Sequence, residues 1–262
     1  MGVDYSTAKK MVQLFARHPG RGRVLMLGRH RFNVPERFRA ALNETLAEHG
    51  FALTHDDLVQ EDGYAETFFM RMGHQEVVTL DISDFEGATI LHDLNAPVPE
   101  ELHGRFDLIY DGGTTEHVFD VATSFSNIHR MLAPGGILVS APPGNGWFGH
   151  GFYQFGPELV YGYWKHGCGY DVLTCSMLPV LPRHKELPLP DPAEKGQRLR
   201  LRGKIPGQRV YLYYEVRRGA RAHDYRQVLQ TDYVNKWSRH DQAAGRSDSG
   251  HVRLREEHVT NL

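Results

Sequence analysis

Three aspartates follow short apolar stretches of the sequence, at the positions where buried strands are expected to end. Asp81 follows EVVTL, Asp93 follows ATILH, and Asp111 follows FDLIY. Ligands of an open parallel sheet bind outside the carboxyl ends of its strands, so these carboxylates are expected to lie along one binding edge. A fourth apolar stretch, VLML, runs into Gly28, which lets a ligand approach the backbone closely. The four positions predict a single ligand site.

The chemistry of these side chains suits an adenosine. An acidic residue after the second strand can accept hydrogen bonds from two ribose hydroxyls, and an aspartate one strand further can accept one from the adenine amine. A nicotinamide dinucleotide would also need a G-x-G-x-x-G loop for its pyrophosphate, whereas Arg29, His30 and Arg31 follow Gly28. The residues therefore favour an adenosine without phosphate, such as S-adenosylmethionine. Arg29 or His30 is then expected to hold the carboxylate of its methionine tail.

Strand and helix patterns alternate along the chain, which predicts an α/β fold with a mostly parallel sheet and helices on both faces. We expect a helix over 6–17, with a serine at its N-cap, and a strand over 209–218 that forms an edge pair with the strand before it. The sheet is predicted to have seven strands. The other helices are expected at 34–50, 64–73, 118–132 and 155–167, and the other strands at 23–28, 76–83, 88–95, 106–113, 137–143 and 170–178.

Composition limits the partners and the compartment. A net charge of −2 gives no field that would attract nucleic acid. Without an apolar run of about 18 residues or a secretory leader, we expect a cytoplasmic protein that makes no contact with membranes. Cys168 and Cys175 are expected to be reduced, and the sixteen histidines show no metal-binding spacing, so no metal is predicted. Residues 1–220 are expected to form one domain. The polar residues 221–262 form a tail, arm or lid, through which a homodimer could assemble.

The segment FDLIYDGGTTEHVFDVATSFSNIHRMLAPGGILVSAPP, residues 106–143, resembles the second half of the class I S-adenosylmethionine-dependent methyltransferase domain. The likeness is carried by FDLI, by Glu116-His117-Val118 and by the PGG turn at 134–136. HGFYQFGPELVYGYWKHGCGYDV is similar to the next segment of that family, and the resemblance covers roughly 20–218. Compared with the family, the chain carries an insertion at 51–75. The resemblance implies a Rossmann-like domain with cofactor contacts at Gly28, Arg29, Asp81, Ile82, Asp93, Leu94, Asp111, Gly112, Gly113 and Glu116.

The acceptor substrate is expected to bind at the glycine-rich aromatic segment 144–154, GNGWFGHGFYQ, because the resemblance places it after the fifth strand. His150 is our candidate general base, since imidazole titrates near neutral pH. Tyr153 and His117 are further catalytic candidates. We expect methyl transfer to an oxygen or nitrogen of a small molecule such as a sugar, a phenol or a natural product. A protein or nucleic-acid methyltransferase and a non-catalytic S-adenosylmethionine-binding subunit remain alternatives.

Overall fold

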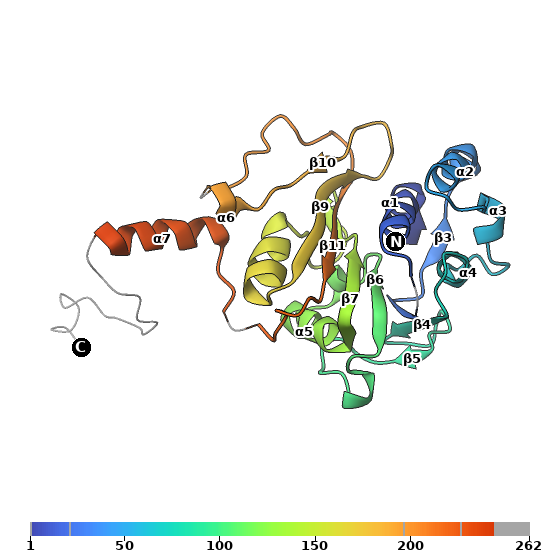
Figure 1. Ribbon diagram of the computed structural model, residues 1–262, viewed down its shortest axis with the longest axis horizontal. Helices are drawn as coiled ribbons and strands as arrows, with labels where there is room; N and C mark the ends of the chain where they lie inside the picture. The colour runs from blue at the N-terminus through green and yellow to red at the C-terminus, as the bar shows by residue number, and fades with distance from the viewer. Residues whose placement is uncertain (1, 21, 196, 226, 244–262) are drawn as a thin grey trace.

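A nine-stranded sheet runs through the centre of the molecule (Figure 1). The computed structural model describes residues 2–20, 22–195, 197–225 and 227–243. The strands lie in the order β10-β9-β11-β7-β6-β2-β4-β5, and β8 pairs with β11 beside this path. Their bounds are β2 Arg23–Leu27, β4 Glu76–Asp81, β5 Ile90–Leu91, β6 Phe106–Asp111, β7 Leu132–Ser140, β8 Pro143–Asn145, β9 Asp171–Pro179, β10 Leu187–Pro188 and β11 Val210–Arg217.

The order of the parallel strands reverses beside β2. From β2 the chain adds β4 and then β5 on one side, and it returns to add β6 and then β7 on the other, all in parallel pairs. The reversal lies between β2 and β6. Loops that leave neighbouring strands in opposite directions open a crevice at such a point, and this is where ligands of open α/β sheets bind.

Helices cover both faces of the sheet. The bounds are α1 Tyr5–Arg17, α2 Arg39–Glu48, α3 His55–Leu58, α4 Glu66–Arg71, α5 Val121–Met131, the π-helical segment Leu159–Gly167, α6 Pro192–Lys195 and α7 Thr231–Ala243. In β2, Val24 and Met26 pack with α1 and α4, whereas Leu25 and Leu27 belong to the core that contains α5 and the π-helical segment. Successive residues of a strand point to opposite faces, so β2 contributes to two separate cores.

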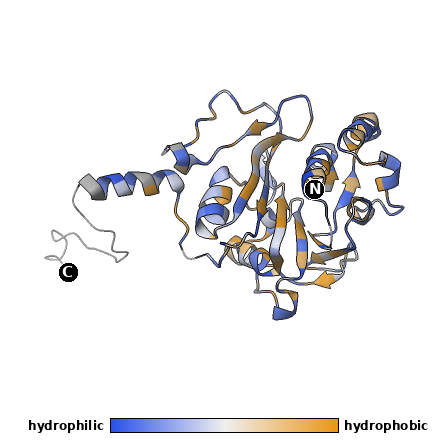
Figure 2. Cartoon of the chain, viewed as in Figure 1, coloured by the Kyte–Doolittle hydropathy of each residue, from blue (hydrophilic) through white to orange (hydrophobic). Residues whose placement is uncertain are grey.

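The hydropathy of the chain follows this layering. Figure 2 shows hydrophobic residues along the central strands, whereas α7, which projects away from the sheet, is mostly polar. Within the residues that the structure describes, no helix is long and apolar enough to cross a bilayer. Of the predicted tail, residues 244–262 lie outside the described part of the chain. Cys168 and Cys175 are buried and free.

The predicted α/β class is confirmed, and three details of the prediction are corrected. The sheet has nine strands because the short β8 and β10 add to the seven expected. β11 pairs with β9 as expected, but the two strands do not form the edge of the sheet, because β10 pairs with β9 and β7 pairs with β11. Asp4, and not Ser6, caps α1, because its carboxylate accepts a hydrogen bond from the backbone N–H of Thr7. The Ser6 hydroxyl instead donates to the carbonyl of Pro179.

Candidate active site

A cavity of about 260 Å³ opens at the carboxyl ends of β4, β5 and β6, beside the reversal of strand order. It brings together predicted cofactor residues from several strand ends with the predicted catalytic residue His117. Its lining is Leu80, Asp81, Ile82, His92, Asp93, Leu94, Asn95, Gly113, Thr114, His117 and Val118. A crevice is therefore present beside the reversal of strand order. Its lining mixes polar and apolar side chains, and none of these residues comes from β2.

The two aspartates predicted to bind adenosine both line this cavity, but they are held differently. Within the described residues, the Asp81 carboxylate accepts one long bond, 3.4 Å from the backbone nitrogen of Ser83, so it keeps capacity for two ribose hydroxyls. Asp93 caps a turn, because its Oδ1 accepts bonds from the backbone and side-chain amides of Asn95 at 2.9 and 2.7 Å. These bonds lower the pKa of Asp93. Of their neighbours, Leu94 is buried in the core and Ile82 is exposed at the cavity.

Gly28 allows the ends of β2 and β6 to approach each other. Its φ is +78°, and a Cβ there would lie 2.9 Å from the hydroxyl oxygen of Thr114. That hydroxyl donates to the carbonyl of Leu27, and the backbone N–H of Gly112 donates to Nε2 of His30 at 3.2 Å. A side chain at position 28 would therefore be strained and would push the two loops apart.

Arg29 points into the insertion at 51–75. Its Nε lies 2.6 Å from Glu66, its second terminal nitrogen lies 2.8 Å from Asp62, and the guanidinium stacks 3.9 Å above the ring of Tyr64. Its remaining nitrogen donates to the carbonyl of Glu86. The structure thus gives all three guanidinium nitrogens partners within the protein. Contact between Arg29 and a cofactor stays a prediction.

Asp111 lies at the end of β6 and is fully buried. Its Oδ1 accepts from the backbone N–H of Thr114 at 2.9 Å, and its Oδ2 accepts from the hydroxyls of Thr115 and Ser140 at 2.7 and 2.9 Å. These bonds shape the turn through Gly113, which has a φ of +106°. Asp111 therefore positions the loop that lines the cavity, and its oxygens are used within the protein.

Glu116 is buried next to this loop in an unusual state. It is 0% exposed, and both of its carboxylate oxygens lack a hydrogen-bond partner within the described chain. Its Oε1 lies 3.6 Å from Nε2 of His117 and 3.5 Å from Nε2 of His150. Burial, followed by the negative charge of Asp111, raises the pKa of Glu116 to about 8. Three residues that were predicted separately thus form one cluster, which we call the Glu116 cluster.

The segment that carries His150 is fixed to Glu116 by backbone contacts. The N–H groups of Phe152 and Tyr153 donate to the carbonyl of Glu116 at 2.8 and 3.3 Å. Gly151 makes this approach possible, since its φ is +72° and a Cβ there would lie 2.8 Å from the same carbonyl oxygen. Trp147 anchors the other end by donating from Nε1 to the carbonyl of Val210.

The ring of His150 lies between two other rings, with centroids 5.2 Å from Trp147 and 4.8 Å from His117. Burial lowers the pKa of His150, which favours the neutral imidazole that a base requires. The hydroxyl of Tyr153 donates to the carbonyl of Phe119 at 2.8 Å, so it already has an acceptor within the protein. Of the catalytic candidates, the two histidines are better placed than the tyrosine.

Several residues of this region escaped the sequence analysis. Phe119 is 70% exposed, and its ring packs 5.5 Å from that of Phe152, which is 64% exposed. Thr114, His92 and Asn95 line the cavity. Asn95 stands just after a predicted strand end, which is the signal that could have identified it. Phe119 lies in a loop whose sequence looks like the start of a helix, and only the fold exposes it.

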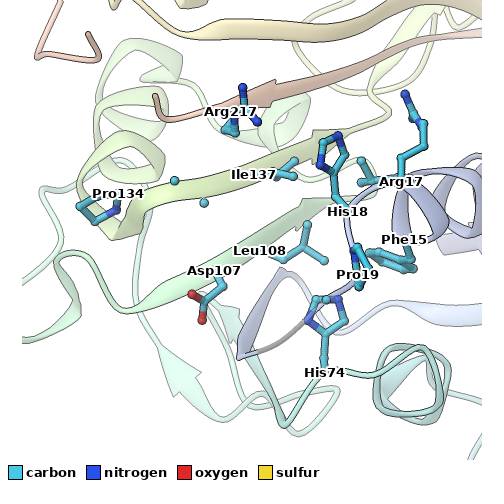
Figure 3. Close-up of a pocket in the computed structure, with 14 residues that line it drawn as sticks. Phe15, Arg17, His18, Pro19, His74, Asp107, Leu108, Pro134, Ile137 and Arg217 are labelled. Carbon is cyan, nitrogen blue, oxygen red and sulfur yellow. The ribbon is translucent and has the colours of Figure 1, made fainter. Parts of the chain in front are cut away.

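A second cavity, of about 410 Å³, lies at the opposite edge of the sheet (Figure 3). Phe15, His18, His74, Asp107 and Arg217 are among the residues that line it. It sits at the amino ends of β6 and β7, and none of the predicted site residues lines it. The carboxyl edge is therefore the candidate active site.

Comparisons with known proteins agree with the domain type. A family model described as a methyltransferase domain matches residues 63–140. No curated protein was found to match the chain.

Similar solved structures include 1,6-didemethyltoxoflavin-N1-methyltransferase from Burkholderia thailandensis, with 15% identity, 81% of this chain and 79% of that chain covered, and a TM-score of 0.42. The [4+2]-cyclase SpnF matches with 14% identity, 81% coverage of each chain and a TM-score of 0.42. A methyltransferase from Mesorhizobium loti matches with 16% identity, 80% and 98% coverage and a TM-score of 0.40. These structural similarities are too weak to assign a reaction. The family match covers less than half of the chain but spans the strand ends that form the cavity, so this part of the chain is similar to a methyltransferase domain.

Proposed function

We propose that the protein transfers the methyl group of S-adenosylmethionine to an oxygen or nitrogen of a small molecule. The observation that carries the proposal is that the cavity at the strand reversal adjoins the Glu116 cluster, with His117 belonging to both. A site of this kind can bind a cofactor on one side and an acceptor on the other.

The residues fit the adenosine part of the cofactor. Asp81 would bind the ribose hydroxyls, the segment from Asp93 to Asn95 would contact the adenine, and Gly113 leaves room beside the backbone. The bound cofactor supplies a methyl group activated by positive sulfur. Because that group is already reactive, the protein mainly needs to align the acceptor and to exclude water.

The acceptor would lie against the Glu116 cluster and the exposed rings of Phe119 and Phe152. His150 can take a proton from an acceptor hydroxyl or ammonium group, since its neutral imidazole is favoured at neutral pH. Exposed aromatic rings suit an acceptor with an apolar or planar face. Sugars, phenols and natural-product scaffolds all have such a face.

Calorimetric titration with S-adenosylmethionine and S-adenosylhomocysteine tests the cofactor part of this proposal. We expect both to bind, with one site per chain. His150→Ala should retain S-adenosylhomocysteine affinity and lower turnover on an acceptor found by screening by about 10²-fold or more. His184→Ala, at an exposed residue outside the cavity and the Glu116 cluster, is the control. Absence of binding for both ligands would refute the proposal.

The remaining expectations are also proposals. Residues 1–220 would form the catalytic domain of a cytoplasmic protein, and α7 would contribute to a homodimer. In favour of the dimer, α7 carries the half-exposed ring of Trp237, and its Tyr233 is 38% exposed. Trp237→Glu should convert a dimer to a monomer in sedimentation experiments. A wild-type monomer at micromolar concentration would refute this part.

A further inference from the structure

The Glu116 cluster combines ligand chemistry with unmet bonding needs. One carboxylate oxygen and two imidazole nitrogens lie within 4.8 Å of one another. Neither oxygen of Glu116 nor Nε2 of His150 has a hydrogen-bond partner in the described chain, although all three atoms are buried. Buried polar groups without partners are rare in folded proteins and require an explanation. A ligand bound between the three side chains would satisfy them.

Two of the three separations are close to those of ligands around a single metal ion. An ion that is about 2.1 Å from its ligands holds tetrahedral ligand atoms about 3.4 Å apart. The observed separations from Oε1 of Glu116 are 3.6 Å to His117 and 3.5 Å to His150. An ordinary hydrogen bond would be shorter, near 2.9 Å. Each histidine nitrogen is thus farther from Oε1 than in an ordinary hydrogen bond and close enough to share an ion with it, and the two nitrogens lie within 4.8 Å of each other.

The cluster is also held in place before any ligand binds. Glu116 and His117 lie on the 3-10 helix Thr115–His117 directly after the β6 loop. His150 is held by the backbone bonds from its loop to Glu116 and by packing against Trp147. Preorganised ligands on fixed elements lose little entropy on binding a cation.

The exposure of the three residues leaves one side of the site open. The Glu116 side chain is 0% exposed, whereas those of His150 and His117 are 33% and 47% exposed. Two histidines and one carboxylate on one side of an ion leave further positions for water or substrate. Imidazole ligands favour Zn²⁺, Fe²⁺, Co²⁺ or Ni²⁺ over Mg²⁺ and Ca²⁺, which prefer oxygen ligands.

We propose that Glu116, His117 and His150 bind one divalent transition-metal ion, and that its open side binds the acceptor oxygen or nitrogen. The second part rests on the proposed function. In this proposal His150 coordinates the metal ion and does not accept the proton of the acceptor. A cation lowers the pKa of a hydroxyl bound to it, so the proton of an acceptor hydroxyl can leave to solvent. The expectation from the sequence was that no metal takes part.

The test uses the full chain without an affinity tag, after dialysis against a chelator. Titration with Co²⁺, followed by its visible absorption, and with Zn²⁺, followed by calorimetry, should give one ion per chain. Glu116→Gln and His150→Ala should each weaken binding at least tenfold, while His129→Ala, at a buried histidine outside the cluster, leaves it unchanged. Thermal melts identify variants that are unfolded. We expect His150→Ala to fold, because His150 lies in a loop.

Titration of S-adenosylhomocysteine into the same samples separates this inference from the proposed function. Binding of the nucleoside without stoichiometric binding of a metal would overturn the metal site and leave the methyltransferase proposal intact. Binding of a metal without binding of S-adenosylhomocysteine would overturn the methyltransferase proposal and leave the metal site intact. Equal metal binding by wild type and by the His117→Ala/His150→Ala double variant would also overturn the inference, because the ion would then sit elsewhere.

Discussion

Two regions at the carboxyl edge of the sheet differ in how completely their ionisable side chains are bonded within the protein. At the end of β2, Arg29 has a partner for each guanidinium nitrogen and an aromatic ring beneath it. At the end of β6, Glu116 is buried without a hydrogen-bond partner in the described chain, and two histidines lie just outside bonding distance. In the first region, the ion pairs of Arg29 with Asp62 and Glu66 hold the insertion to the sheet. In the second region, the Glu116 carboxyl, whose pKa is raised to about 8, and Nε2 of His150 have no such partners in the described chain, so they can bind a ligand.

The comparison shows why residue type alone does not identify a site. From the sequence, Arg29 beside a cofactor loop and Glu116 at the start of a helix are equally good candidates for binding a ligand. Burial without a partner costs a charged group several kcal/mol, so such a group is retained where a ligand or a neutral state compensates. The hydrogen-bond partners of a side chain therefore distinguish a ligand site from a structural contact better than its position after a strand does.

The largest effect is expected from separating the two halves of the Glu116 cluster. Gly151→Ala would place a Cβ 2.8 Å from the carbonyl of Glu116 at a φ of +72°, so the loop that carries His150 must move. A displacement of about 1 Å in a reacting group costs about 10²-fold in rate. We expect a loss of turnover of that size with unchanged S-adenosylhomocysteine affinity. Gly149→Ala is the matched control, because its Cβ would meet nothing within 4 Å. Equal activity of the two variants would contradict a role for this geometry.

The next largest effect is expected at Asp81, whose carboxylate has the most free bonding capacity in the cavity. A hydrogen bond to a charged group is worth about 1.5–3 kcal/mol, so the loss of even one such bond in Asp81→Ala should weaken S-adenosylhomocysteine binding at least about 10- to 100-fold by calorimetry. Asp93→Ala should have a smaller effect, because one of its oxygens already caps a turn. The reverse ranking would show that the ribose lies elsewhere.

The periodic parts of the fold were predictable from sequence. Uniformly apolar runs such as VLML mark parallel strands that are buried on both faces, and the structure places them in the middle of the sheet. The pairing of β11 with β9 was predicted, but its pairing with β7 was not, because that contact joins strands far apart in the sequence. Capping by Asp4 was missed because Ser6 offered a similar local signal.

That the residues at the strand ends would lie at one edge was predictable for the same reason, since parallel strands bring their carboxyl ends together. The partners of Arg29 were not, because Asp62 and Glu66 come from an insertion whose path has no periodic signal. The joining of Glu116 with His150 depends on the turn at Gly151, which sequence alone does not fix.

His74, which lines the cavity at the opposite edge of the sheet, is another buried side chain without hydrogen-bond partners in the described chain, and its protonation bears on stability. Its two ring nitrogens lack partners in the described chain, but it packs among aromatic rings, 5.1 Å from Phe15 and 6.4 Å from Phe69. Burial lowers its pKa from 6.5 to about 4. The unfolded chain therefore binds more protons than the folded chain between pH 6.5 and 4, and the free energy of unfolding falls as the pH drops through this window.

At pH 5 this loss amounts to roughly 2 kcal/mol relative to pH 8. His74→Phe should remove that share of the pH dependence in urea unfolding at the two pH values, whereas His184→Phe, at an exposed position, should not. His129, whose pKa is also lowered to about 4, keeps part of the dependence in both variants. An unchanged pH slope in His74→Phe would mean that His74 is not buried as a neutral ring.

The smallest effect is expected at Arg29, and it tests the comparison most directly. Arg29→Lys keeps the charge but cannot serve Asp62, Glu66 and the carbonyl of Glu86 together, because only the guanidinium has a planar fork of donors. We expect a loss of about 1 kcal/mol in the free energy of unfolding. S-adenosylhomocysteine affinity should change less than twofold, as it should in the exposed control Arg183→Lys. If Arg29→Lys instead loses S-adenosylhomocysteine affinity tenfold and keeps its full stability, Arg29 binds the cofactor. Both regions would then bind a ligand, and the contrast drawn between them would be wrong.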